Sequence, residues 1–242
     1  VVDSVVPANL RGPNNDWVAI AKRSRVMYYN PLNVSAEEME NLAYEDLSDP
    51  KWIGRIAIRS SGNMYNQSLV SSLISNHGVA TIEKWGHHFV GNFARKPEGN
   101  DRAQIMAVAN GEADIAIANS YYIGLMLSGK KGDEQRAAAR KVNLHFPSQA
   151  GRGAHINVSG AGLMKNSPNK ANAVKFIEFL LSDKAQEHIV NNTYEYPLSV
   201  NVAPSDLIAQ FGTGFKEDQT SVSDYGKFNP EAVKLMDRVG WQ

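Results

Sequence analysis

The sequence predicts an α/β fold with mixed, mostly parallel sheets, because short strand-like runs alternate with helix-like runs along the whole chain. Its 242 residues are enough for one large domain or for two lobes with separate cores. Hydrophobic residues make up 43% of the chain and charged residues 21%, which is typical of a globular protein. These observations favour strands joined by helical crossovers.

Charge and cysteine content narrow the classes of function. Lys plus Arg equals Asp plus Glu, 25 against 25, so the charge balance gives no support to binding of nucleic acids or anionic membranes. The chain has no cysteine, which excludes disulfides, thiolate nucleophiles and cysteine-based zinc sites. No run of 18 apolar residues occurs, so we expect no membrane span.

The expected strands are runs of β-branched, aromatic and apolar residues bounded by turn signals. The first, residues 16–30 (DWVAIAKRSRVMYYN), forms one or two strands and is stopped by Asn30 and Pro31. Residues 55–59 (RIAIR) alternate in polarity, as a short strand does. The other expected strands cover residues 114–118, 142–146, 154–158 and 160–164.

The expected helices show apolar residues at helical spacing and recognisable end signals. Ser35 and Glu38 form a capping-box pattern, and Gly78 is placed to end a helix. Residues 169–182 form the clearest amphipathic helix, and a second helix continues to about residue 191. The remaining helices are expected at residues 64–77, 81–93, 101–110, 120–128, 133–141 and 230–239.

Two adjacent tyrosines, Tyr121 and Tyr122, follow the strand expected at residues 114–118. Ligands in α/β folds bind beyond the carboxyl ends of strands, so both lie where binding side chains are found. A third, Tyr65, follows a similar polar loop before a helix. A phenol stays protonated at neutral pH unless a strong positive charge stabilises its anion. Converging phenols therefore point to a trivalent ion such as ferric iron, which gains most from hard anionic oxygen.

The structural alternative for a tyrosine is a ring packed in the core with its hydroxyl at the rim. We expect that role for Tyr28 and Tyr29, because neighbours inside a strand point to opposite faces. His87 and His88 are adjacent on a helix and diverge by about 100 degrees, so they are expected to be surface or boundary residues rather than a chelating pair.

Three further polar residues have two interpretations each. His155 lies among glycines, where a structural role is favoured over metal ligation. Arg152 either meets an anion in a cleft or is a solvated loop charge, which is the favoured interpretation. Glu195 either supports a metal site from behind or is a turn charge.

Several stretches resemble the periplasmic ferric-iron-binding proteins of ABC importers, the Fbp and Fut type. They include DWVAIAKRSRVMYYN, RSSGNMYNQSLVSSLI, NGEADIAIANSYY and NNTYEYPLS. The resemblance covers nearly the whole chain and is greatest to the cyanobacterial Fut group. It implies a two-lobed type II periplasmic-binding-protein fold that closes on its metal, with one lobe incomplete in this chain.

The resemblance also implies a site. The family's tyrosine ligands correspond to Tyr65, Tyr121 and Tyr122, and the spacing of 56 residues between the first two agrees with the Fut type. Arg25 resembles an arginine that neutralises the phenolates or an anion beside the iron, and Arg23 is the less favoured candidate. The implied cargo is Fe(III), with carbonate or citrate as an accompanying anion.

The same resemblance divides the chain between two lobes. Residues 24–147 and 199–242 correspond to the carboxyl-terminal lobe, and residues 1–23 and 148–198 to the amino-terminal lobe. The family's first segment, which carries a further His-Tyr or Tyr ligand, has no counterpart here. The opening run VVDSVVPANL has no Met and begins like the middle of a domain, so we expect a shortened or processed chain.

We therefore expect a periplasmic, monomeric solute-binding protein that captures ferric iron, delivers it to an ABC transporter permease and catalyses no reaction. Two alternatives stay open: the same fold binding another small solute, such as an anion, a polyamine or a sugar, or an intracellular iron-handling protein. An enzyme is least favoured, because Ser159 lacks the G-x-S-x-G elbow and the chain contains neither H-E-x-x-H nor a P-loop.

Overall fold

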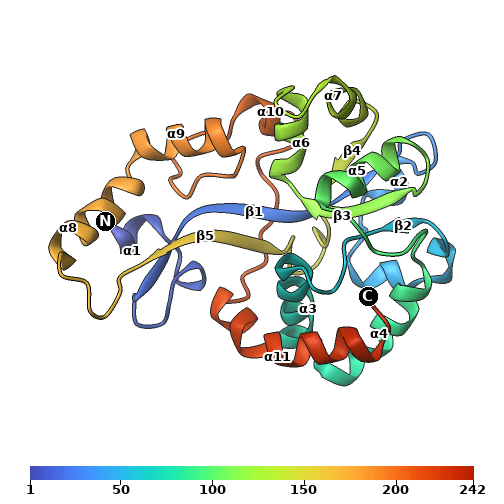
Figure 1. The fold of residues 1–242 in the computed structure, drawn as a ribbon, viewed down its shortest axis with the longest axis horizontal. Helices are drawn as coiled ribbons and strands as arrows, with labels where there is room; N and C mark the ends of the chain where they lie inside the picture. The colour runs from blue at the N-terminus through green and yellow to red at the C-terminus, as the bar shows by residue number, and fades with distance from the viewer.

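A single long strand, β1 (Trp17–Tyr29), runs through the middle of the protein (Figure 1). The computed structural model describes all of residues 1–242. The first half of β1 pairs with β5 (Ile156–Gly162), and its second half lies between β3 (Ile115–Asn119) and β4 (Asn143–His145). At the edge, β3 pairs with β2 (Ile56–Ala57). One strand thus connects the two ends of the molecule.

The mixed α/β class is confirmed, but the sheet is less parallel than expected. Only β2 and β3 pair in parallel, whereas β1 is antiparallel to β3, β4 and β5. Alternating strands and helices predict crossovers, but they do not reveal that β1 is inserted between two later strands in the opposite direction. The two strands expected at residues 154–158 and 160–164 form one strand, because Gly160 and Gly162 pair with β1.

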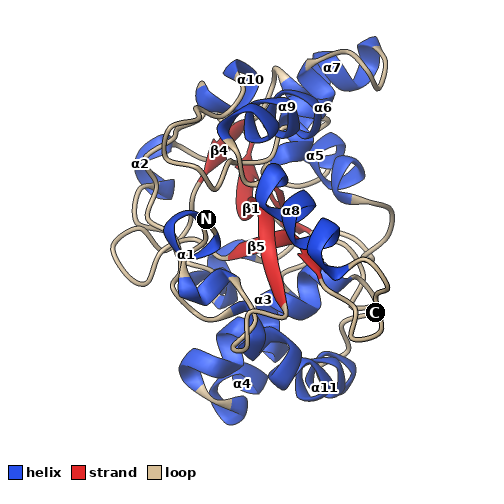
Figure 2. Ribbon diagram, turned by 90° about the vertical axis from the view of Figure 1, so that its left-hand side faces the viewer, coloured by secondary structure: helices blue, strands red, loops and turns tan.

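Helices lie on both sides of the part of the sheet that contains β3 (Figures 1 and 2). One side carries α3 (Met64–His77), α4 (Val79–Gly91) and α11 (Val222–Arg238). The other carries α5 (Asp101–Ala109), α6 (Tyr121–Leu127), α7 (Asp133–Ala139) and α10 (Asp206–Ala209). The remaining helices are α1 (Val2–Val5), α2 (Ala36–Met39), α8 (Lys170–Leu180) and α9 (Asp183–Thr193). No helix combines the length and apolar character that crossing a membrane requires.

Alternating residues of β1 fill a core on each side of the sheet, as the period of a strand requires. Met27 and Tyr29 belong to the cluster shared with α3, α4 and α11. Val26 and Tyr28 belong to the cluster shared with α5 and α6. A third cluster of seven residues lies at the other end of β1 and includes Val18.

Two helix-end signals act as the sequence predicts. The hydroxyl of Ser35 accepts a hydrogen bond from the amide of Glu38 at 3.1 Å and so begins α2. Gly78 ends α3 with a φ of 79 degrees, a conformation that a glycine adopts without steric cost. The start of α2 and the end of α3 are therefore set by local chemistry.

One helix, α11, begins earlier than expected, at Val222 instead of near residue 230, and Pro230 lies inside it. The hydroxyl of Ser221 caps its start by accepting from the amide of Ser223 at 3.3 Å. Buried residues lie on both sides of the proline. Tertiary packing of one apolar face therefore overrides the stop that a proline usually gives.

The amphipathic helix α8 forms where the periodicity predicts it, but part of its apolar surface faces outward. Phe176 is 59% exposed and Phe179 is 52% exposed, and none of the residues of α8 is buried. Ile177 alone packs against the small core cluster at that end of β1. Large apolar side chains of an amphipathic helix are ordinarily covered, and the rest of the chain leaves these two phenylalanines exposed.

Candidate metal centre

The three predicted tyrosines form one cluster. The hydroxyl oxygens of Tyr65 and Tyr121 lie 3.5 Å apart, although the two residues are 56 positions apart in the sequence. The ring of Tyr121 stacks on that of Tyr122, with centroids 4.1 Å apart and planes 29 degrees from parallel. All three side chains are half-buried, so the cluster is held by packing and remains open to solvent on one side.

The end of β3 positions Tyr121 and Tyr122 in the first turn of α6. The amide of Ser120 donates to the carbonyl of Ser24 at 2.9 Å, and the amide of Ser24 donates to the Ser120 hydroxyl at 3.2 Å. The hydroxyl of Tyr28 donates to the carbonyl of Ser120 at 3.2 Å. The expected structural role of Tyr28 is thus confirmed, and it holds the turn that presents the pair.

Tyr65 lies in the first turn of α3, where side chains hold the backbone. The side chain of Asn63 accepts from the amide of Tyr65 at 3.1 Å. Asn66 Nδ2 donates to the carbonyl of Arg59 at 2.9 Å, which fixes the loop before the helix. Ser68 Oγ donates to the carbonyl of Tyr65 at 3.0 Å. These bonds prearrange the phenol that meets Tyr121.

The two adjacent phenols are hard to ionise without a cation. Burial, together with hydrogen bonds to the hydroxyls of Tyr122 and Tyr65, raises the pKa of Tyr121 far above the usual value. Burial also raises the pKa of Tyr122. Both groups are therefore protonated at neutral pH in the metal-free protein. A metal ion that binds here must displace their protons, which requires a strongly polarising cation.

Three guanidinium groups surround the ring of Tyr65. The Cζ atoms of Arg23, Arg25 and Arg59 lie 5.5, 5.7 and 5.9 Å from its centroid, within the range of cation–π contacts. The two predicted arginines are thus both at the cluster. Sequence reasoning missed Arg59, although it ends the alternating run RIAIR and directly precedes the polar loop that leads to Tyr65.

Arg25 is fully buried, and its charge is already balanced. Its Nη1 donates to Asp101 Oδ2 at 2.6 Å and to Asn119 Oδ1 at 3.2 Å, and its Nη2 donates to Asn66 Oδ1 at 2.6 Å. Asp101, also fully buried, accepts from the amide of Asn119 at 2.8 Å. Arg25 therefore connects α3, α5 and β3 behind the tyrosines. Its predicted role in offsetting phenolate charge stays a prediction.

Arg23 is balanced by a different carboxylate. Its Nη1 donates to Glu195 Oε1 at 2.9 Å and to Ser159 Oγ at 2.7 Å. The carboxylate of Glu195 accepts from the Ser159 hydroxyl as well, at 3.0 Å. Glu195 is therefore buried behind an arginine of the cluster and is not a solvated turn charge. Ser159 serves as its hydrogen-bond partner.

The histidines lie as expected. His87 and His88 are both exposed on α4. His155 is fully buried, and its Nε2 lies 3.1 Å from Ser68 Oγ. Burial lowers the pKa of His155 to about 3, so its ring is neutral at physiological pH.

The structure contradicts both interpretations of Arg152. It forms ion pairs with Glu45 and, at 3.2 Å, with Asp218, so it is neither a solvated loop charge nor free to meet an anion. Two acids far apart in the sequence converge on it, which no local pattern indicates.

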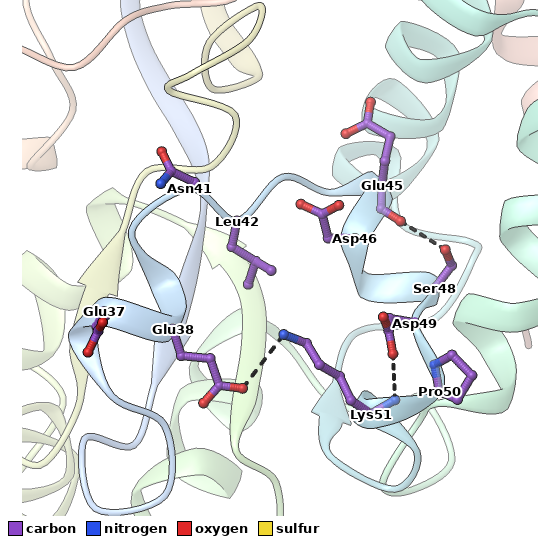
Figure 3. A pocket seen from close by; sticks show the side chains of 10 residues that line it. All are labelled: Glu37, Glu38, Asn41, Leu42, Glu45, Asp46, Ser48, Asp49, Pro50 and Lys51. Atoms are coloured by element: carbon purple, nitrogen blue, oxygen red, sulfur yellow. Dashed lines mark hydrogen bonds and ion pairs between the residues drawn. The ribbon is translucent and has the colours of Figure 1, made fainter.

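A hollow of about 470 Å³ adjoins the cluster, and its walls include Arg23, Tyr65, Ser68 and Tyr225. A larger hollow of about 560 Å³, drawn in Figure 3, contains none of the predicted site residues. Its lining is Glu37, Glu38, Asn41, Leu42, Glu45, Asp46, Ser48, Asp49, Pro50 and Lys51. No group of three or more His, Cys, Asp or Glu side chains is placed to hold a metal ion.

The fold and the tyrosine cluster define a class of protein. The chain matches the family of bacterial extracellular solute-binding proteins (SBP_bac_6) over residues 2–210, and it belongs to that family. Its structural relatives include ferric-binding proteins, among them one from Campylobacter jejuni with a TM-score of 0.91 and 37% identity over all of this chain and 75% of that one. The predicted type II periplasmic-binding-protein fold is therefore confirmed.

Particular relatives are more similar still. The chain is 47% identical to Iron uptake protein A1 of Synechocystis sp. over its whole length, and it spans 66% of that protein, just under two thirds. It is 44% identical to Iron uptake protein A2 of the same organism, over 98% of this chain and 68% of that one. Trichodesmium FutA (IdiA), solved with iron and citrate, superposes with a TM-score of 0.96 at 50% identity, over all of this chain and 75% of that one.

Proposed function

We propose that this chain carries the tyrosine side of the iron site of a ferric solute-binding protein. In this proposal Tyr65, Tyr121 and Tyr122 bind Fe(III) through their phenolate oxygens. The observation that carries it is the convergence of the three phenols, with two hydroxyl oxygens 3.5 Å apart. Relatives named for iron uptake and ferric binding support the choice of metal.

The chemistry of the cluster favours a trivalent ion. Phenolate is a hard anionic ligand, and softer or less charged ions gain less from it. Each phenol that binds must lose its proton, so affinity falls as the solution becomes acidic. Three phenolates and one Fe(III) sum to zero charge, so the one positive charge that remains on the three arginines and two carboxylates around the cluster can attract an accompanying anion. Carbonate and citrate are the candidates, and citrate is present with iron in the Trichodesmium relative.

The remaining assignments follow from the same proposal. Residues 24–147 and 199–242 form the lobe that carries all three tyrosines, and residues 1–23 and 148–198 belong to the other lobe. β1 passes from one lobe to the other and pairs with β5 along the way, so it is placed to serve as a hinge strand. The loaded monomer delivers iron to an ABC permease in the periplasm and catalyses no reaction.

The test is a visible absorption titration of the iron-stripped chain with ferric citrate. Ferric phenolate absorbs visible light, so the parent should develop a broad band that saturates at one iron per chain. The Tyr121→Phe/Tyr122→Phe double variant should lose it. Tyr29→Phe is the matched control, since the Tyr29 hydroxyl accepts a single hydrogen bond, from Asn143 Nδ2 at 3.3 Å, and lies outside the tyrosine cluster.

A parent chain without a band would contradict the proposal for this chain. A band that survives in the double variant would move the ligation to other residues. Binding of a sugar, polyamine or anion without colour would instead support the alternative solute for the same fold.

A further inference from the structure

The buried carboxylate of Asp101 is shared by two guanidinium groups beside the tyrosines. Its Oδ2 binds Arg25 at 2.6 Å, and its Oδ1 binds Arg59 Nη1 at 3.3 Å. One negative charge thus faces two positive charges. The third guanidinium, on Arg23, has Glu195 as its own carboxylate at 2.9 Å. The group of three arginines and two acids therefore carries one uncompensated positive charge.

That charge is concentrated on Arg59. Arg25 has three side-chain acceptors and no exposure, whereas Arg59 has a single side-chain acceptor, at the longest distance of the group. The side chain of Arg59 is 21% exposed, and it faces the tyrosines with its Cζ 5.9 Å from the centre of the Tyr65 ring. Its backbone is fixed, because its carbonyl accepts from Trp241 Nε1 at 3.0 Å.

We propose that Arg59 is a charge-setting residue of the site: its uncompensated guanidinium weakens the preference of the tyrosine cluster for ferric over ferrous iron. The inference rests on the proposed function and adds a residue with a separate property. Fe(III) with three phenolates is neutral, and the same ligands around Fe(II) carry one negative charge. A nearby cation stabilises the anionic ferrous form relative to the neutral ferric form, so Arg59 raises the reduction potential of the bound iron.

The experiment measures that potential directly. The 242-residue chain and its variants are loaded with ferric citrate and poised against redox mediators while the phenolate band is followed. Arg59→Gln removes the charge and should increase the ferric-to-ferrous affinity ratio on the order of tenfold. For one electron, that corresponds to a potential about 59 mV more negative. Arg59→Lys keeps the charge and should stay near the parent value.

Two further variants serve as controls for the measured reduction potential. Arg140→Gln removes an exposed arginine near the end of α7 and should leave the potential unchanged. Arg59→Met keeps the packing of the long stem without the charge, and it replaces Arg59→Gln if that variant unfolds in urea earlier than the parent. Both uncharged variants should shift the potential in the same direction.

The outcomes separate this inference from the proposed function. A parent band with an unchanged potential in Arg59→Gln and Arg59→Met overturns the role of Arg59 and leaves ferric binding intact. An equal shift in Arg59→Lys also overturns it, because charge would then not be the cause. If the parent chain develops no visible band, the proposed ferric ligation itself is contradicted, and with it the role of Arg59.

Discussion

The hydroxyl of Tyr28 donates a hydrogen bond to the backbone carbonyl of Asn119 at 3.0 Å. This bond joins the carboxyl end of β1 to the end of β3, directly before the turn that presents Tyr121 and Tyr122. Two tyrosine pairs in the chain thus have different roles. Inside the strand, the Tyr28 hydroxyl supports the backbone, whereas the pair beyond a strand end lies half-buried at the tyrosine cluster.

Replacing Tyr28 with Phe should destabilise the fold and disturb the site. The carbonyls of Asn119 and Ser120 would lose a buried donor, which costs about 1–3 kcal/mol of the free energy of unfolding. Urea unfolding measures that loss. Tyr29→Phe is the control and should lose less, because its hydroxyl has one partner, at 3.3 Å. Equal losses in the two variants would show that the bond to β3 adds nothing.

Replacing Asp101 with Asn should be among the most damaging polar substitutions. It would leave the fully buried guanidinium of Arg25 without its only carboxylate, at a cost of about 3–5 kcal/mol. Thermal or urea unfolding of the metal-free chain provides the measurement. Asp133→Asn, at an exposed position in the first turn of α7, should cost far less. A stable Asp101→Asn variant would contradict the buried ion pair.

Acid should destabilise the chain through His155. Burial lowers the pKa of His155 to about 3, and the positive charges of Arg152 and Arg25 act in the same direction, against the opposing charge of Asp218. The unfolded chain has a histidine pKa of about 6.5, so between pH 6.5 and 3 it binds a proton that the folded chain does not. The stabilisation is therefore complete above pH 6.5 and is lost as the pH falls toward 3.

The measurement compares the free energy of unfolding of the parent and of His155→Gln across this range. The difference between them should shrink by up to about 1.4 kcal/mol per pH unit below 6.5. A difference that does not change with pH would mean that His155 takes up its proton equally in both states.

Replacing either of two phenylalanines with alanine should have very different effects on the free energy of unfolding. Phe89 is fully buried and stacks on Trp85 with ring centroids 4.5 Å apart, so Phe89→Ala should cost about 3–5 kcal/mol. Phe179 is 52% exposed on α8, and Phe179→Ala should change stability by no more than about 0.5 kcal/mol. Urea unfolding of both variants tests this. A large loss of stability in Phe179→Ala would mean that Phe179 is covered in solution.

Local sequence signals were sufficient to predict the positions of most of the helices. Ser35 and Gly78 mark helix ends through their own hydroxyl and backbone chemistry, which acts within a few residues. The start of α11 was missed because packing of its apolar face outweighs Pro230. The direction of β1 was missed because strand order depends on pairings between segments far apart in the sequence.

The sequence by itself determined the α/β class, the positions of most elements and the choice of Tyr65, Tyr121 and Tyr122, because periodicity, end signals and residue chemistry are local properties. Only the tertiary structure brought two of those hydroxyls to 3.5 Å, balanced Arg25 and Arg23 with Asp101 and Glu195, and left Arg59 as the least compensated charge. Electrostatic balance is a property of groups that meet in space, and a buried carboxylate shared by two arginines has no signature along the chain.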